Sequence, residues 1–148
     1  MIRQGLIQEA NVTIGAHLDT GYYVILRTGC IIGDEVKIWS HTVIDPGARI
    51  GNNVKIHCNC YISQGVIIED DVFIGPNVIF LNDKYPPRYE PELWTPPIVR
   101  KGAIIGGGCS IGPGVEIGER AIIGAGAVVI KSVPAHQLWV GVPASRLK

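Results

Sequence analysis

The sequence lacks a net charge, a long apolar run and a signal peptide. Its 148 residues include 13 Lys and Arg and 13 Asp and Glu, which gives a formal charge of zero and argues against a nucleic-acid partner. No apolar segment has the length of a transmembrane helix, and the start, MIRQGLIQEA, has neither the apolar core nor the cleavage site of a signal peptide. We therefore expect no membrane partner and a cytoplasmic location.

Cysteine is also scarce, with four residues in the chain. Cys58 and Cys60 form a C-x-C sequence without a second pair, so neither a metal site nor a disulfide framework is predicted. Cys30, Cys60 and Cys109 occupy positions that are otherwise filled by small apolar residues, and we expect them to be buried as small hydrophobic side chains.

The apolar residues between Ile32 and Phe80 lack the periodicity of a helix or of a simple strand. An aliphatic residue recurs at every sixth position instead: Ile32, Ile38, Ile44, Ile50, Ile56, Ile62, Ile68 and Ile74, closed by Phe80. Small residues stand two positions earlier, from Cys30 to Val78. Six residues per unit predicts a hexapeptide β-helix, in which each unit is a short strand and a turn and the stacked units bury an apolar interior.

The six-residue register covers almost the whole chain but is interrupted once. It extends backward to Ile14, fails over NDKYPPRYEPELWTPP, and resumes one residue out of phase at Val99. A proline-rich segment without apolar periodicity predicts an extruded loop, at about 82–97. We expect one all-β domain over residues 1–148: a parallel β-helix of about six triangular coils of eighteen residues, with this loop and a short C-terminal cap at about 131–148.

Eighteen residues per coil also assign the outward side chains to faces, because side chains alternate along a strand. One face carries an apolar stripe, which we expect to be an oligomer interface: Ile25, Val43, Tyr61, Ile79 and Val128, with Ser110 among them. The next face includes Asp19, Lys37 and Lys55.

Polar residues stack at two corners of the predicted prism. At one corner His41 and Asn59 lie in one column, and His57 lies two residues earlier in the coil; this cluster is either a ladder of turn residues, which asparagine favours, or part of a site. At the next corner Asn82 stacks above Gln64, where the loop leaves. The loop supplies aromatic rings for stacking and an arginine that can donate hydrogen bonds to a phosphate. A nucleotide-linked substrate needs both. The candidate substrate-binding residues are His41, Asn59, Gln64, Asp83, Tyr85, Arg88 and Trp94.

The hexads themselves resemble a known family. Units such as IGDEVK, IGNNVK, IGPNVI and IGAGAV resemble the left-handed β-helix of hexapeptide-repeat acyltransferases, and this resemblance implies a left-handed coil and a homotrimer. The segment IEDDVFIGPNVIFLNDKYPPR, with the hexads after the loop, looks like the nucleotide-sugar N-acetyltransferases that acetylate a 3-amino or 4-amino sugar. That likeness implies acetyl-coenzyme A as the donor.

The resemblance also implies roles for individual residues. Galactoside-type relatives have a catalytic histidine a few residues after the equivalent of Phe80, whereas the nucleotide-sugar group has an asparagine, which matches Asn82. We therefore expect Asn82 to orient the amine, with His57 or His41 as proton acceptor or hydrogen-bond partner. The expected coenzyme A contacts are Gly107, Ala125, Ile130, Lys131 and Arg146.

Three other interpretations remain open. An O-acetyltransferase on a sugar or serine hydroxyl would depend on a histidine base. A non-catalytic β-helix assembly subunit would keep the fold without the chemistry. A γ-class carbonic anhydrase needs three histidines that converge on one metal between subunits, and His17, His41 and His57 do not fall at suitable coil positions.

Overall fold

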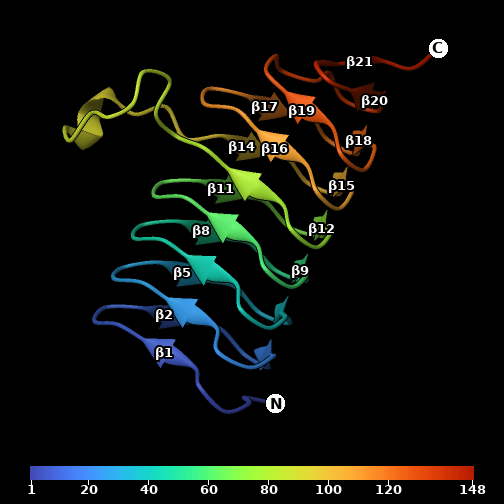
Figure 1. Ribbon diagram of the computed structural model, residues 1–148. Coiled ribbons are helices and arrows are strands. Elements are labelled where there is room, and N and C mark those ends of the chain that lie inside the picture. The colour runs from blue at the N-terminus through green and yellow to red at the C-terminus, as the bar shows by residue number, and fades with distance from the viewer.

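The computed structural model describes residues 1–148 as three parallel β-sheets that coil into a triangular prism (Figure 1). Sheet A contains β1 (Ile7–Gln8), β4 (Ile25–Leu26), β7 (Val43–Ile44), β10 (Tyr61–Ile62), β13 (Ile79–Phe80), β16 (Ser110–Ile111) and β19 (Val128–Val129). Sheet B contains β2 (Thr13–Ile14), β5 (Ile31–Ile32), β8 (Arg49–Ile50), β11 (Ile67–Ile68), β14 (Ile98–Val99) and β17 (Glu116–Ile117). Sheet C contains β3 (Asp19–Thr20), β6 (Lys37–Ile38), β9 (Lys55–Ile56), β12 (Phe73–Ile74), β15 (Ile104–Ile105), β18 (Ile122–Ile123), β20 (Leu138–Gly141) and β21 (Ala144–Arg146).

The six-residue period produces this architecture directly. In each two-residue strand of the central coils the second side chain is buried and the first points outward, as at Lys37 and Ile38. The turns between strands need a residue in the left-handed region, which Asn53, Asn59 and Gly47 supply with φ of 53°, 59° and 68°. The result is a solenoid of the kind expected for a left-handed β-helix, so the predicted fold class is confirmed.

The interior is a continuous column of small and aliphatic side chains. It comprises 33 buried hydrophobic residues, among them Cys30, Cys60 and Cys109, whose expected burial is confirmed. Burial raises the pKa of all three thiols, that of Cys30 to about 11, so these cysteines are poor nucleophiles at neutral pH. None of the helical segments is long and apolar enough to cross a membrane.

The coil is longer at both ends than the sequence predicts, with seven strands in sheet A where about six coils were expected. At the start, β1 pairs with β4 although its inward position holds Gln8, which is tolerated because Gln8 is exposed at the open end of the prism. At the C-terminal end, β20 adds in parallel to β18, and the antiparallel β21 folds back on β20. Trp139 of this cap packs on the core.

The extruded loop leaves the prism without disturbing the coil (Figure 1). The backbone N–H of Thr95 donates to the carbonyl of Asn82 at 2.8 Å, and the N–H of Gly114 donates to the carbonyl of Thr95 at 2.7 Å. Strand β14 then pairs with β11 in the register Ile68 with Val99, which confirms the predicted phase shift. The only helical element in the loop is the short 3₁₀ turn η1 (Pro91–Leu93).

Candidate functional site at the two edges of sheet A

The polar residues predicted from the sequence lie along the two edges of sheet A. We call the turns from sheet C to sheet A (residues 21–23, 39–41, 57–59, 75–77, 106–108 and 124–126) the CA corner. The turns from sheet A to sheet B, including the loop, form the AB corner. Within one coil, the five residue-to-residue steps from Asn59 to Gln64 separate the two corners by about 16 Å of extended chain. The two groups therefore do not meet within one protomer.

His57 is held firmly at the CA corner. Its imidazole stacks on the indole of Trp39, with ring centroids 4.4 Å apart and planes at 14°, and meets the ring of Phe73 edge-on at 5.3 Å. The buried hydroxyl of Thr42 donates to the carbonyl of His57 at 2.8 Å and accepts from the N–H of Cys60 at 3.2 Å. The ring and its backbone are therefore both fixed, as a group that must present one nitrogen to a ligand requires.

His41 and Asn59 serve the turns of the same corner. Both have left-handed backbone angles, with φ of 61° and 59°, and the N–H of Asn59 donates to the carbonyl of Ser40 in the coil below. The imidazole of His41 stacks on Tyr23 at 5.6 Å and remains exposed. Asn59 thus fits the turn-ladder interpretation, whereas His41 combines a turn position with an accessible ring.

Asn82 marks the AB corner at the base of the loop. Its side-chain amide donates from Nδ2 to the carbonyl of Gln64 at 3.1 Å, while its own carbonyl accepts from Thr95. The predicted stacking of Asn82 above Gln64 is therefore present. The first bond orients the side chain, the second holds the backbone, and Oδ1 is left as a hydrogen-bond acceptor for a ligand.

The loop is closed by an internal ion pair between Asp83 and Arg88. Nε of Arg88 donates to Oδ1 of Asp83 at 2.6 Å, and the N–H groups of Arg88 and Tyr85 donate to the same carboxylate. Trp94 donates its indole N–H to the carbonyl of Arg88 at 3.0 Å. Desolvation acts to raise the pKa of Asp83, but the hydrogen bonds from Arg88 and Tyr85 outweigh it and lower the pKa below its usual value. The Arg88 guanidinium, expected to bind phosphate, is thus engaged within the loop.

Replacing Asp83 with asparagine is expected to loosen the loop and leave the coil intact. Because the pKa of Asp83 is lowered in the folded state, the carboxylate stabilises the loop above the pKa of an ordinary carboxyl, and this stabilisation is lost as pH falls through the lowered value. In Asp83→Asn, the hydrogen-exchange protection factors of the Tyr85 and Arg88 amides should be low already at neutral pH. In the wild type they should fall only under acid conditions. Equal protection in both proteins at neutral pH would exclude this role.

The expected coenzyme A contacts do not all lie at one corner. Gly107 and Ala125 stack at the CA corner, where the N–H of Gly126 donates to the carbonyl of Gly107 at 2.9 Å. The coils there are so close that a Cβ added at Gly106 would lie 2.5 Å from the backbone nitrogen of Ala125. Glycine at position 106 therefore serves the stacking of the coils. A Cβ added at Gly126, in the turn above, would meet nothing within 4 Å, so the backbone of that turn is open to a ligand.

The other three expected contacts lie elsewhere. Ile130 and Lys131 are exposed in the top turn of the AB corner, and Arg146 is exposed on β21. No group of three or more His, Cys, Asp or Glu side chains is placed to hold a metal ion.

Two features of the outer faces were not predicted. On sheet A the hydroxyl of Tyr61 donates to Oδ2 of Asp45 at 2.5 Å, so the stripe contains a polar link. Burial, and then the hydrogen bond to Asp45 and its charge, raise the pKa of Tyr61 to about 12. On sheet C four side chains follow one another in register and form a second apolar stripe: Phe73, Ile104, Ile122 and Leu138. Three of these four residues follow the loop, where the six-residue register is shifted by one position.

The comparisons with known proteins agree with this fold. The family described as bacterial transferase hexapeptide (six repeats) matches residues 47–82 and 96–131. A putative acetyltransferase from Bacillus cereus superposes with a TM-score of 0.76 and is 30% identical over 97% of this chain and 82% of its own. No curated protein matches the chain by sequence.

Two solved structures of lower identity share the fold. A mutant GDP-perosamine N-acetyl transferase from Caulobacter crescentus, in complex with CoA and GDP-perosamine, is 20% identical with a TM-score of 0.64, over 97% of this chain and 58% of its own. A mutant N-acyltransferase from Bacillus cereus, in complex with dTDP and coenzyme A, is 22% identical with a TM-score of 0.64, over 92% of this chain and 83% of its own. With its six-residue register, its family match and its relative in Bacillus cereus, the chain belongs to the hexapeptide-repeat acyltransferase superfamily.

Proposed function

We propose that the protein transfers an acetyl group from acetyl-coenzyme A to the amine of a nucleotide-linked amino sugar. The observation that carries this proposal is Asn82, which is fixed at the base of the loop by its bond to Gln64. Both histidines of the cluster lie at the other edge of sheet A. The names and bound ligands of the relatives from Caulobacter crescentus and Bacillus cereus support the same substrate class. A cytoplasmic location remains a prediction.

An asparagine in this position suits an amine nucleophile better than a hydroxyl. An amine attacks the thioester carbonyl carbon once it is unprotonated, the C–S bond breaks, and the proton released from nitrogen passes to the thiolate sulfur. A hydroxyl needs a base to remove its proton during attack. In our proposal Oδ1 of Asn82 accepts a hydrogen bond from the amine or its sugar and orients it, and His57 assists as proton acceptor or hydrogen-bond partner.

Acetyl-coenzyme A is assigned to the bare backbone of the upper CA corner. The turn that follows Ala125 is open, since a Cβ added at Gly126 would meet nothing within 4 Å, and the extended arm of the donor can run against the backbone there. Lys131 and Arg146 are exposed cations that can meet its phosphates. The donor supplies the activated acyl group, and the chain supplies its orientation.

The complete site forms in this proposal between two subunits of a homotrimer. A threefold ring needs two different complementary surfaces on each subunit. The stripe on sheet A (Ile25, Val43, Tyr61, Ile79 and Val128) provides one of these surfaces. The loop corner of one subunit then meets the CA corner of its neighbour, and Asn82 reaches the acyl donor only in the oligomer.

Assay of purified protein with acetyl-coenzyme A and a panel of nucleotide-linked 3-amino and 4-amino sugars tests this function through thiol release. We expect Asn82→Ala to lower kcat by about 10²-fold, the usual effect of removing one transition-state hydrogen bond. His57→Ala should lower kcat by about tenfold, less than the loss of a general base.

A larger effect of His57→Ala than of Asn82→Ala would favour the alternative function, an O-acetyltransferase with a histidine base. If Asn82→Ala keeps full turnover, His57→Ala abolishes it and a hydroxyl acceptor is preferred, the proposed role of Asn82 is wrong. Absence of thiol release with every amine and hydroxyl acceptor would favour a non-catalytic assembly subunit.

A further inference from the structure

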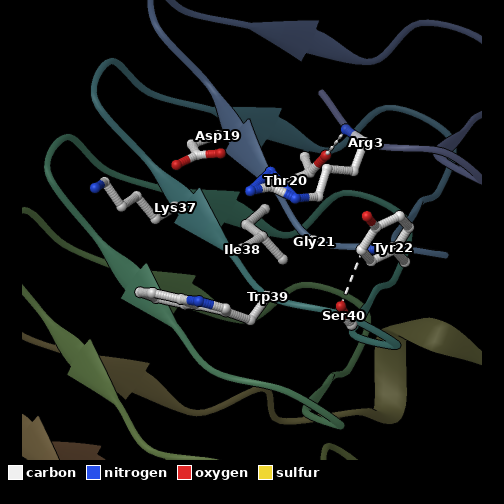
Figure 2. Close-up of a pocket in the computed structure, with 9 residues that line it drawn as sticks. All are labelled: Arg3, Asp19, Thr20, Gly21, Tyr22, Lys37, Ile38, Trp39 and Ser40. Atoms are coloured by element: carbon white, nitrogen blue, oxygen red, sulfur yellow. Dashed lines mark hydrogen bonds between the residues drawn. The ribbon is translucent and has the colours of Figure 1, made fainter. Parts of the chain in front are cut away.

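A cavity of about 260 Å³ lies on sheet C beside the lower CA corner, at the N-terminal end of the prism (Figure 2). Its walls come from β3, β6 and the turns that follow them, and from the N-terminal segment: Arg3, Asp19, Thr20, Gly21, Tyr22, Lys37, Ile38, Trp39 and Ser40. The volume is slightly below the roughly 300–1,000 Å³ of typical small-molecule sites. The cavity therefore fits one part of a nucleotide sugar and not the whole molecule.

One wall of this cavity is a stacking surface. The residues Gly21, Trp39 and His57 occupy the same position in successive coils, since the N–H of Gly21 donates to the carbonyl of Ile38 and that of Trp39 to the carbonyl of Ile56. One face of the Trp39 indole lies against His57 at 4.4 Å. The coil below contributes only Gly21, so the other face of the indole is turned to the cavity and is accessible to a planar ring.

The charges around the cavity favour an anion. Arg3 and Lys37 have no carboxylate oxygen within the 4.0 Å of an ion pair, whereas Arg88 in the loop is paired with Asp83 at 2.6 Å. Lys37 projects from β6 beside Asp19 of β3 (Figure 2). The Arg3 guanidinium lies near Ile38, between the Lys37–Asp19 pair of strands and Tyr22. Lys55 continues the row of cations on β9, in register with Lys37. Asp19 is the only acidic residue of the lining.

We propose that this cavity binds the nucleoside diphosphate end of the substrate, an inference that rests on the proposed function. The base stacks on the free face of Trp39, as aromatic side chains bind bases of any sequence. The diphosphate is neutralised by Arg3 and Lys37. Oδ1 of Asp19 is paired with the N-terminal ammonium at 3.5 Å, and its other oxygen accepts hydrogen bonds from ribose hydroxyl groups, which carboxylates bind well.

This assignment places both substrates along one edge of the prism. The cavity, His57 and the bare turns of Gly107 and Ala125 follow one another up the CA corner, so the reacting amine and the thioester would meet between its two ends. The loop of the neighbouring subunit then covers the sugar instead of binding the phosphates. The sequence led us to expect the phosphate contact from Arg88; in this proposal Arg3 and Lys37 make that contact instead.

Titration calorimetry with UDP, dTDP and GDP, without a sugar, tests the cavity directly. We expect measurable binding of at least one of them, and Lys37→Glu should weaken it by about tenfold or more, because a charged hydrogen bond is lost and a repulsion is added. The matched control is Arg49→Glu on β8 of sheet B, an exposed cation on another face, which should change affinity less than about twofold. Trp39→Leu provides a second test, with a loss of about tenfold from the base stack.

The outcomes separate this inference from the proposed function. No binding of any nucleoside diphosphate, an equal effect of Lys37→Glu and Arg49→Glu in folded proteins, or loss of binding in Arg88→Ala alone would overturn the cavity assignment. If Lys37→Glu still turns over nucleotide-linked amino sugars with an unchanged KM for the sugar, the cavity is not the nucleotide site but the proposed function is retained. If a nucleoside diphosphate binds through Lys37 and Trp39 but no amine is acetylated, the proposed function is wrong and the cavity is still a nucleotide site.

Discussion

Replacing Ile79 with aspartate is expected to leave the β-helix folded and to reduce acetyl transfer to background. The side chain points outward from β13 and is 42% exposed in the protomer, so a carboxylate there costs the isolated coil little. In the proposed trimer the same position is buried in the apolar contact, where an unpaired charge is strongly destabilising. Sedimentation should show monomers, circular dichroism an unchanged β signal, and the thiol-release assay no turnover.

Ile31 provides the matched control for this substitution. It is the outward residue of β5 on sheet B and is 40% exposed, almost the same as Ile79, but it lies on the face that carries neither stripe. Ile31→Asp should retain both assembly and activity. A dilute wild-type monomer that turns over, or equal effects of the two substitutions, would show that sheet A is not the interface.

A mixing experiment tests whether one site takes residues from two subunits. Asn82→Ala damages the loop corner, and Ala125→Trp blocks the turn assigned to the donor at the exposed CA corner, so each variant alone should keep about a hundredth of the activity or less. In mixed trimers about one interface in four combines an intact loop corner with an intact CA corner, and about a quarter of the activity should return. Inactive mixtures of properly assembled trimers would place the whole site within one subunit.

Phe80→Ala is expected to lower the free energy of unfolding by about 3–5 kcal/mol, the range for deletion of a buried aromatic ring. Phe80 is 0% exposed and is the largest of the fully buried side chains, at the inward position of β13 where the loop departs. The cavity left behind lies two residues before Asn82, so activity should fall together with stability. Urea unfolding, followed by circular dichroism, measures the change.

Ile74→Val is the control for size at a neighbouring core position. Ile74 is fully buried in β12, and removal of one methyl group should cost about 0.5–1.5 kcal/mol. A loss for Phe80→Ala no larger than that of Ile74→Val would mean that the coil collapses around the missing ring, and that the loop base is not supported by the core.

The sequence predicts the backbone well because the six-residue period leaves little choice. A slip of one residue would turn Ile56 or Ile74 outward, so burial fixes the register and with it the stacking of Asn82 over Gln64 and of Gly107 under Ala125. The first coil was missed because its inward position, Gln8, is polar and lies at an open end. The six-residue period does not show where the coil begins or ends, because a terminal coil faces water on one side and tolerates a polar residue at its inward position.

Partners of individual side chains could not be predicted in the same way. The Asp83–Arg88 pair closes inside the loop, and the Thr42 hydroxyl holds the carbonyl of His57, although neither contact follows from a spacing. Both depend on rotamers and on turns that are specified by packing. The stacking of Trp39 on His57 could have been found, since the two residues are eighteen positions apart at one corner.

The bond between Thr95 and Asn82 has a consequence for how such proteins diversify. Because this bond closes the coil beneath the loop, residues 83–94 form a detachable unit whose two ends are already joined by the scaffold. Insertions, deletions or exchange of this unit leave the stacked strands unchanged, and loop length adds little to the entropic cost of closure. Substrate choice can therefore change by replacement of one short segment while the rest of the chain continues to fold as before.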